Sequence, residues 1–273
     1  MKKRIWFELP VRRDLGNDTI IDKLRREYPV GLVNGLVMSD RAAGLPHFCD
    51  VEEILSRRLV ERVKQQFPEL EVVNLVRTGD RCNFQLDRVL GELEQQGTSK
   101  VVLVSGHEYR TSLLNKSLTG KLCDKRCGDG HAERNVLCGV ESTVALRRSY
   151  SGKLIRGAVC SNPKVDFKPQ AAFTVTQIAP LRNTADWLDQ FPQPVVLTIM
   201  PMLSMRDLQR VSALGALDWQ LSPNTTTAEF TPQMGLELAK QALQIGLNHA
   251  KVKGIYLYSP SPPAVMELTK YML

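Results

Sequence analysis

The sequence predicts an α/β fold, a single (β/α)8 TIM barrel. Short apolar runs alternate with amphipathic stretches along the whole chain of 273 residues. There are eight such runs, and they are largely apolar on both faces, as expected of a buried parallel sheet. Eight strand–helix pairs in about 250 residues are typical of this barrel. An open doubly wound sheet is the structural alternative, but the turn ELPVRRDLGND after the first run lacks its Gly-rich phosphate motif.

The elements follow in order along the chain. The predicted strands, rich in Val and Ile, span residues 4–9, 31–38, 71–77, 100–106, 154–161, 172–178, 194–201 and 254–259. The predicted helices span residues 18–28, 51–67, 84–97, 132–150, 184–191, 204–214, 234–252 and 262–273. The fifth unit is the weakest, because NPKVDFKPQA offers little helix before the sixth strand. No linker or repeat interrupts the series, so we expect one domain over residues 1–273.

Composition excludes several classes of protein. The chain is 43% hydrophobic and 24% charged, which is ordinary for a globular protein. No apolar run approaches the roughly 18 residues of a membrane span, and the first run is too short for a signal peptide. We therefore expect a cytoplasmic protein without a membrane partner. The net charge of +7 favours anionic partners. The basic residues are scattered and no nucleic-acid module is recognisable, so we expect no nucleic-acid partner.

A cysteine-rich segment lies between the fourth and fifth predicted strands. Without an export signal, disulfides are not expected. The stretch KLCDKRCGDGHAERNVLC offers four soft ligands for a zinc ion, Cys123, Cys127, His131 and Cys138. Their spacing is looser than the usual C-x2-C knuckle. An active-site loop with incidental thiols is the alternative interpretation, and a loop that folds over phosphates is another.

Polar residues at the carboxyl ends of the predicted strands are the candidates for chemistry, because barrel enzymes place their active sites there. Glu8 ends the first strand and Gln177 lies near the end of the sixth. Each is a single polar residue on an otherwise apolar strand, and both point at one mouth. Further polar residues at or after strand ends are Ser39, Arg77, His107, Asn162, Lys164, Tyr256 and Tyr258.

Four stretches resemble one known family, the methylenetetrahydrofolate reductases. FELP is similar to their strand-one Phe-Glu-Phe-x-Pro signature, and FTVTQI to their strand-six Thr-Gln motif. VVLTIMPMLSMRDLQRVSALG resembles their strand-seven segment. MGLELAKQALQIGLNHAKVKGIYLYS is similar to their last long helix and His-Phe-Tyr strand. The order and spacing hold over residues 4–260.

The resemblance implies a function and a site. The family binds FAD and passes a hydride from NAD(P)H to 5,10-methylenetetrahydrofolate, giving 5-methyltetrahydrofolate. By this resemblance Glu8 is the general acid, and we expect an apolar mouth to disfavour its charged form so that it donates a proton. Gln177, whose amide both donates and accepts, would bind the pterin. Also implied are His107 and Tyr258 for the substrate, and Ser39, Arg77, His107 and Lys168 for the cofactor.

Departures from the family pattern fall on the flavin contacts. Asn74 stands where the strand-three His is expected, and His107 replaces the Asp of the strand-four Gly-Asp. The Arg that often follows strand eight is absent from SPSPPA. One interpretation is a divergent reductase. Another is a flavin-free folate-binding or methyl-transfer protein, or a subunit of a larger one-carbon complex. A third is an interaction barrel without catalysis. The expected partners are a folate substrate and further copies of the chain.

Overall fold

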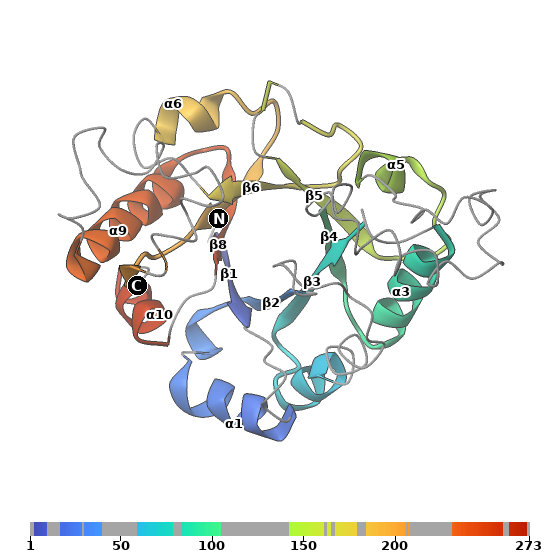
Figure 1. Cartoon of the computed structure of the whole chain (residues 1–273), viewed down its shortest axis with the longest axis horizontal. Helices are drawn as coiled ribbons and strands as arrows, with labels where there is room; N and C mark the ends of the chain where they lie inside the picture. The colour runs from blue at the N-terminus through green and yellow to red at the C-terminus, as the bar shows by residue number, and fades with distance from the viewer. Residues whose placement is uncertain are drawn as a thin grey trace, which may run out of the picture.

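The computed structural model describes residues 3–9, 17–28, 30–39, 59–78, 83–104, 142–160, 163–164, 167–178, 184–205, 207, 231–258 and 262–271. Their strands form one sheet that closes on itself in chain order, with every neighbouring pair parallel (Figure 1). The strands are β1 (Arg4–Leu9), β2 (Gly35–Ser39), β3 (Glu71–Arg77), β4 (Lys100–Val104), β5 (Ile155–Cys160), β6 (Thr174–Ile178), β7 (Val195–Ile199) and β8 (Val252–Leu257). The predicted (β/α)8 barrel is confirmed.

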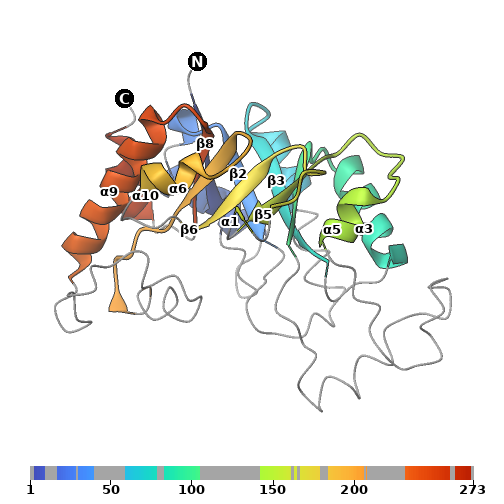
Figure 2. The same cartoon turned by 90° about the horizontal axis from the view of Figure 1, so that it is seen from above.

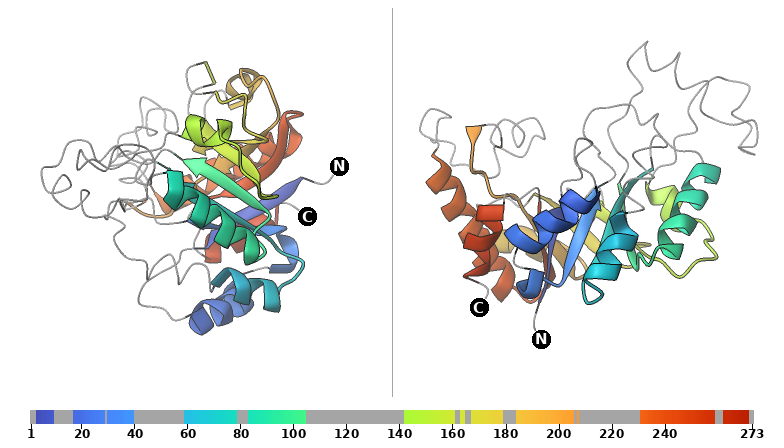
Figure 3. Two further views of the ribbon diagram at one scale, coloured as in Figure 1. Left: turned by 90° about the vertical axis from the view of Figure 1, so that its right-hand side faces the viewer. Right: turned by 90° about the horizontal axis from the view of Figure 1, so that it is seen from below.

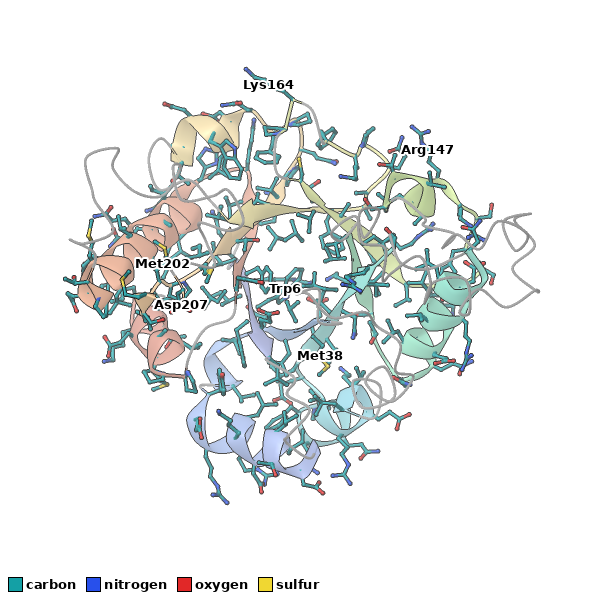
Figure 4. All side chains as sticks on the ribbon, in the orientation of Figure 1. Trp6, Met38, Arg147, Lys164, Met202 and Asp207 are labelled. Carbon is teal, nitrogen blue, oxygen red and sulfur yellow. The ribbon has the colours of Figure 1, made fainter. Side chains whose placement is uncertain are left out.

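Side chains alternate between the inside and the outside of the barrel along each strand. The inside is a cluster of one residue from almost every strand: Trp6, Val37, Val73, Val102, Val175, Val196 and Tyr256. Figure 4 shows Trp6 within the ring of strands, whereas Met38 lies outside it. The interior is therefore a packed apolar core, and polar side chains on the same inward face are exceptions that require an explanation.

Helices cover the outer face of the sheet. They are α1 (Asn17–Glu27), residues 59–66, α3 (Asn83–Gln95), α5 (Ser142–Arg147), α6 (Thr184–Asp189), α9 (Pro232–Asn248) and α10 (Pro262–Thr269). Two outer clusters hold them to the strands: one joins α3 and α5 to β3, β4 and β5, and the other joins the remaining helices to β1, β2, β7 and β8. Figures 2 and 3 show α9 and α10 on one side of the barrel and α3 and α5 on the opposite side.

Residues at the start of α9, the longest described helix, explain why it forms there. Thr231 is its N-cap, and its side-chain oxygen accepts a hydrogen bond from the backbone N–H of Met234 at 3.2 Å. Pro232 follows at the first helical position, where its missing N–H costs nothing. Ala239, Ala242 and Leu243 face β7 and β8 and are almost fully buried. The helix thereby fixes the two strands that carry the last residues of the mouth.

One predicted strand begins later in the structure than expected. The strand expected at 31–38 begins only at Gly35, because residues Val30–Leu32 form a 3-10 turn. Asn34, just before β2, makes two hydrogen bonds to β1. Its side-chain oxygen accepts from the N–H of Ile5, and its backbone N–H donates to the Ile5 carbonyl. The described residues between β5 and β6, namely 163–164 and 167–173, contain no helix, in agreement with the weak fifth unit.

An ionic cluster closes the amino-terminal end of the barrel. The carboxylate of Glu71, the first residue of β3, accepts hydrogen bonds from Arg4 Nη1 at 3.0 and 3.1 Å and from the indole Nε1 of Trp6 at 3.0 Å. Lys100 also donates to it, and its ammonium lies 5.6 Å from the centre of the Trp6 ring. This end is filled by groups that satisfy one another, which leaves the opposite end as the place for a ligand.

Candidate functional site

The mouth at the carboxyl ends of the strands carries a buried acid. Trp6 packs inside the barrel, whereas Phe7 and Leu9 pack outside it, so alternation puts Glu8 on the inward face. The side chain of Glu8 is only 6% exposed. A carboxylate at the end of an apolar strand is therefore held in the barrel mouth and does not extend into solvent. Because burying a carboxylate is costly, this position is a candidate for function.

Two tyrosines, one in the last strand and one just after it, lie beside this acid. Tyr256 is paired in register with Trp6 on β1 and with Thr198 on β7, and its ring belongs to the interior cluster. Tyr258 lies two residues further toward the mouth, and the two rings meet edge to face with centroids 6.0 Å apart. Burial raises the pKa of the Tyr256 phenol well above its usual value, and the charges of Glu8 and Tyr258 raise it further. Tyr256 is consequently a neutral hydroxyl at any physiological pH.

A buried guanidinium enters the same mouth from β3. Arg77 ends this strand, and it shares the inward face with Val73 and Leu75, which pack in or against the interior cluster. Its side chain is 1% exposed and is the largest of the fully buried side chains among the described residues. A guanidinium is a fork of donors that suits carbonyl, carboxylate or phosphate oxygens. The mouth therefore combines a strong acceptor, Glu8, with a fixed cation.

A bulge in β6 shapes the side of the mouth where Gln177 lies. The register between β6 and β7 shifts between Val175 and Ile178. Thr176 and Thr198 hold the bulge by two reciprocal bonds: the N–H of Thr198 donates to Thr176 Oγ1 at 2.9 Å, and the hydroxyl of Thr198 donates to the Thr176 carbonyl. Bulges often re-aim a side chain next to an active site. The backbone of Gln177 lies within this bulge. Its side chain lies outside the described part of the structure.

The remaining predicted residues divide into two groups. Lys168 is buried, and its ammonium donates to the carbonyl of Val159 at 3.2 Å, so it supports the backbone of β5. Lys164 is exposed on the outer rim (Figure 4). Asn74 faces outward, where its Oδ1 accepts from the hydroxyl of Thr98 at 2.9 Å. The side chain of Ser39 and all of Asn162, His107, Cys123, Cys127, His131 and Cys138 lie outside the described residues.

No zinc site can be located from the described residues. Among them, no group of three or more His, Cys, Asp or Glu side chains is arranged to hold a metal ion. Because the four predicted ligands all lie outside those residues, the zinc hypothesis stays a prediction. In the same described part of the chain, no helix is long and apolar enough to cross a membrane.

Comparison with known proteins identifies the fold but no sequence family. No family model matches the chain, and no curated protein matches it. A crystal structure of dihydropteroate synthetase with a product matches with a TM-score of 0.52 and 11% identity, over 99% of this chain and 92% of the other. Yersinia pestis dihydropteroate synthase with a pterine-sulfa conjugate matches with a TM-score of 0.49 and 10% identity, over 99% and 93%. At this identity the likeness is one of fold.

The predicted membership of the methylenetetrahydrofolate reductase family is wrong. The solved structure that matches with a TM-score of 0.52 is a dihydropteroate synthetase, which is a different family, and no family model supports the predicted assignment. The predicted flavin oxidoreductase activity and hydride transfer to methylenetetrahydrofolate, which rest on that assignment, are wrong as well. The physical reason for the error is that each quoted motif is a strand, with or without its neighbouring helix, in which an apolar run meets a polar residue, and any such barrel supplies that pattern. Binding of FAD and NAD(P)H, as such, stays a prediction.

The sequence predicts two features of the mouth only in part or not at all: it offers Tyr256 as a strand-end candidate without showing that the ring is buried in the barrel, and it does not indicate the role of Thr198. Tyr256 was one of two tyrosines in GIYLYS, and only the register shows that its ring lies in the barrel core. Thr198 lies in VVLTI, and nothing in that run signals its bond to β6. A signal did exist for Tyr256: a bulky polar aromatic at an inward position of a small barrel is unusual, because branched aliphatic residues dominate there.

Proposed function

We propose that the protein binds a pterin-type heterocycle of the folate group in the mouth of the barrel, without using a flavin. The observation that carries this proposal is the buried Glu8 carboxylate at the rim of an apolar, aromatic interior. A pterin is a flat ring with adjacent amino and ring N–H donors on one edge. A carboxylate accepts two such parallel bonds, as it does from an arginine. Ligand sites of this kind are apolar pockets with a few convergent polar groups.

The surrounding residues support the same ligand. Tyr258 offers an aromatic surface near Glu8, and Arg77 supplies donors for the carbonyl or carboxylate oxygens of a folate. The net charge of +7 suits the anionic tail of such a compound. The dihydropteroate synthetase with product has the same kind of fold, which makes a dihydropteroate-like pterin the first probe to try. Placement of Gln177 at the bulge of β6 makes it the second pterin-binding candidate.

A calorimetric titration with pterin and with tetrahydrofolate tests the proposal on the whole chain. Glu8→Gln keeps the shape but removes the charge, and we expect it to weaken binding about tenfold to a hundredfold, the range for a charge-assisted hydrogen bond. Glu237→Gln is the matched control, because Glu237 is an exposed residue of α9 paired with Lys240. Equal pterin affinities for wild type and Glu8→Gln would refute the role of the acid, and they are what an interaction barrel predicts.

Location and assembly complete the proposal. A folate-binding role goes with a place in the cytoplasm, which cell fractionation tests. A homo-oligomer is expected, and light scattering of the purified chain tests it: a mass near 30.6 kDa, that of one chain, would contradict it.

A further inference from the structure

The hydroxyl of Tyr256 is a buried polar group without a hydrogen-bond partner among the described residues. The side chain is 4% exposed, and its buried Oη atom has no hydrogen-bond partner. Tyr256 lies in register with Trp6 on β1 and with Thr198 on β7. Both neighbours have other bonds, since the indole of Trp6 donates to Glu71 and the hydroxyl of Thr198 donates to the Thr176 carbonyl.

An unpaired buried hydroxyl costs free energy, and most buried polar groups avoid that cost. Tyr150 shows the ordinary case in this same chain: its hydroxyl donates to Glu94 Oε2 at 2.9 Å. A phenylalanine at position 256 would fill the interior as well and would leave no group unpaired. The hydroxyl of Tyr256 is therefore a candidate for a hydrogen bond to a bound ligand.

We propose that Tyr256 is a ligand-reading donor at the floor of the mouth, which together with Glu8 recognises the adjoining N–H and C=O of a pterin. This inference rests on the proposed function and adds which edge of the ring is read. Glu8 accepts from the amino group and the ring N–H. Tyr256, one step deeper on the neighbouring strand, donates to the carbonyl oxygen next to that N–H.

Electrostatics keep this pair in the required form. Burial raises the pKa of the Tyr256 phenol, and the carboxylate of Glu8 raises it further, so the phenol keeps its proton. The two side chains are thus a fixed donor beside an acceptor. A 4-oxo pterin presents the matching acceptor and donor, whereas a 2,4-diaminopteridine presents an amino group where the carbonyl stood. The site should prefer the oxo compound, because a donor facing a donor leaves one group unsatisfied.

Tyr256→Phe, which removes one oxygen atom, tests the inference in the full-length chain. We expect binding of pterin to weaken about tenfold, as for the loss of one buried hydrogen bond, while binding of 2,4-diaminopteridine changes much less. We also expect the ligand-free variant to melt no lower than wild type, since no bond in the free protein is lost. Tyr150→Phe is the matched control: it should melt lower, because it loses the bond to Glu94, and bind pterin as wild type does.

The two proposals fail in different ways. If wild type binds pterin and Tyr256→Phe binds it equally well, the inference is overturned while the proposed function stands. A ligand-free Tyr256→Phe that melts several degrees below wild type would also overturn it, because the hydroxyl would then have a partner within the chain. If wild type binds neither pteridine, the proposed function is refuted, and the edge-reading inference is refuted with it.

Discussion

Replacing Glu71 by glutamine should destabilise the barrel by an amount that its contacts define. Glu71 accepts from Arg4, from Lys100 and from the indole of Trp6, and its side chain is 17% exposed. The bond to Arg4 counts for little, since the side chain of Arg4 is 58% exposed. The bonds from Lys100, which is 15% exposed, and from Trp6 are partly buried and involve an ionised acceptor.

The expected loss follows from these contacts. Hydrogen bonds to charged groups contribute about 1.5–3 kcal/mol each, and glutamine keeps one oxygen that still accepts from one donor. We therefore expect the free energy of unfolding to fall by about 2–3 kcal/mol, mostly because Lys100 loses its carboxylate. For a chain of this size that is a decrease in Tm of about 4–5 °C. Thermal unfolding followed by circular dichroism, with urea unfolding beside it, measures both quantities.

Asp22→Asn is the control for this measurement. It makes the same chemical change in an exposed ion pair, with Arg25, and should cost about 0.5 kcal/mol or less. The double variant Glu71→Gln with Lys100→Met should recover part of the loss, because neither partner is then left alone. The reasoning is refuted if Glu71→Gln is no more destabilising than Asp22→Asn, or if the double variant is simply the sum of the two single losses.

Three further outcomes are expected. Gly246→Ala on α9 would put a Cβ 2.7 Å from side-chain atoms of Ile255 and Leu197, so urea unfolding should show a loss of about 1 kcal/mol, the cost of overpacking less the gain in helix propensity. Thr198→Val removes the hydroxyl bond to the Thr176 carbonyl; calorimetry should show weaker pterin binding, and unchanged binding would contradict a role for the bulge. The pKa values of Tyr28, Tyr150 and Tyr256 are raised, which favours the neutral phenol in the folded state. Their contribution to stability is therefore complete below pH 10. It is lost as pH rises through about 12 for Tyr28 and Tyr150, and at higher pH for Tyr256. Phenolate absorbance against pH should show late titration of Tyr28, Tyr150 and Tyr256, and a normal titration of all three would contradict the burial.

The barrel was readable from the sequence because its signal is repeated. Each strand is a short run rich in Val, Ile and Leu, and each run recurs after a connection long enough for a helix. The face of each residue was not readable, because strands buried on both sides carry apolar residues at odd and even positions alike. Trp6 and Phe7 look equivalent in RIWFEL, yet one packs inside the barrel and the other outside.

The candidate site was readable only in part for the same reason. Glu8 was found because it is the single acid on an apolar strand, and the structure places it, buried, at the mouth. Arg77 was found at a strand end, but its burial depends on neighbours from other strands. The unpaired hydroxyl of Tyr256 depends on contacts between residues far apart in the chain, so a local pattern does not reveal it. Family membership failed because strand and helix patterns of this kind are common to barrels of different function.

The most direct test of the central claim is a pair of calorimetric titrations of the full chain, one with pterin or dihydropteroate and one with FAD. The proposal predicts saturable binding of the pterin compound that is weakened by Glu8→Gln, and no binding of FAD. Tight uptake of FAD by a chain that binds no pterin compound would contradict it.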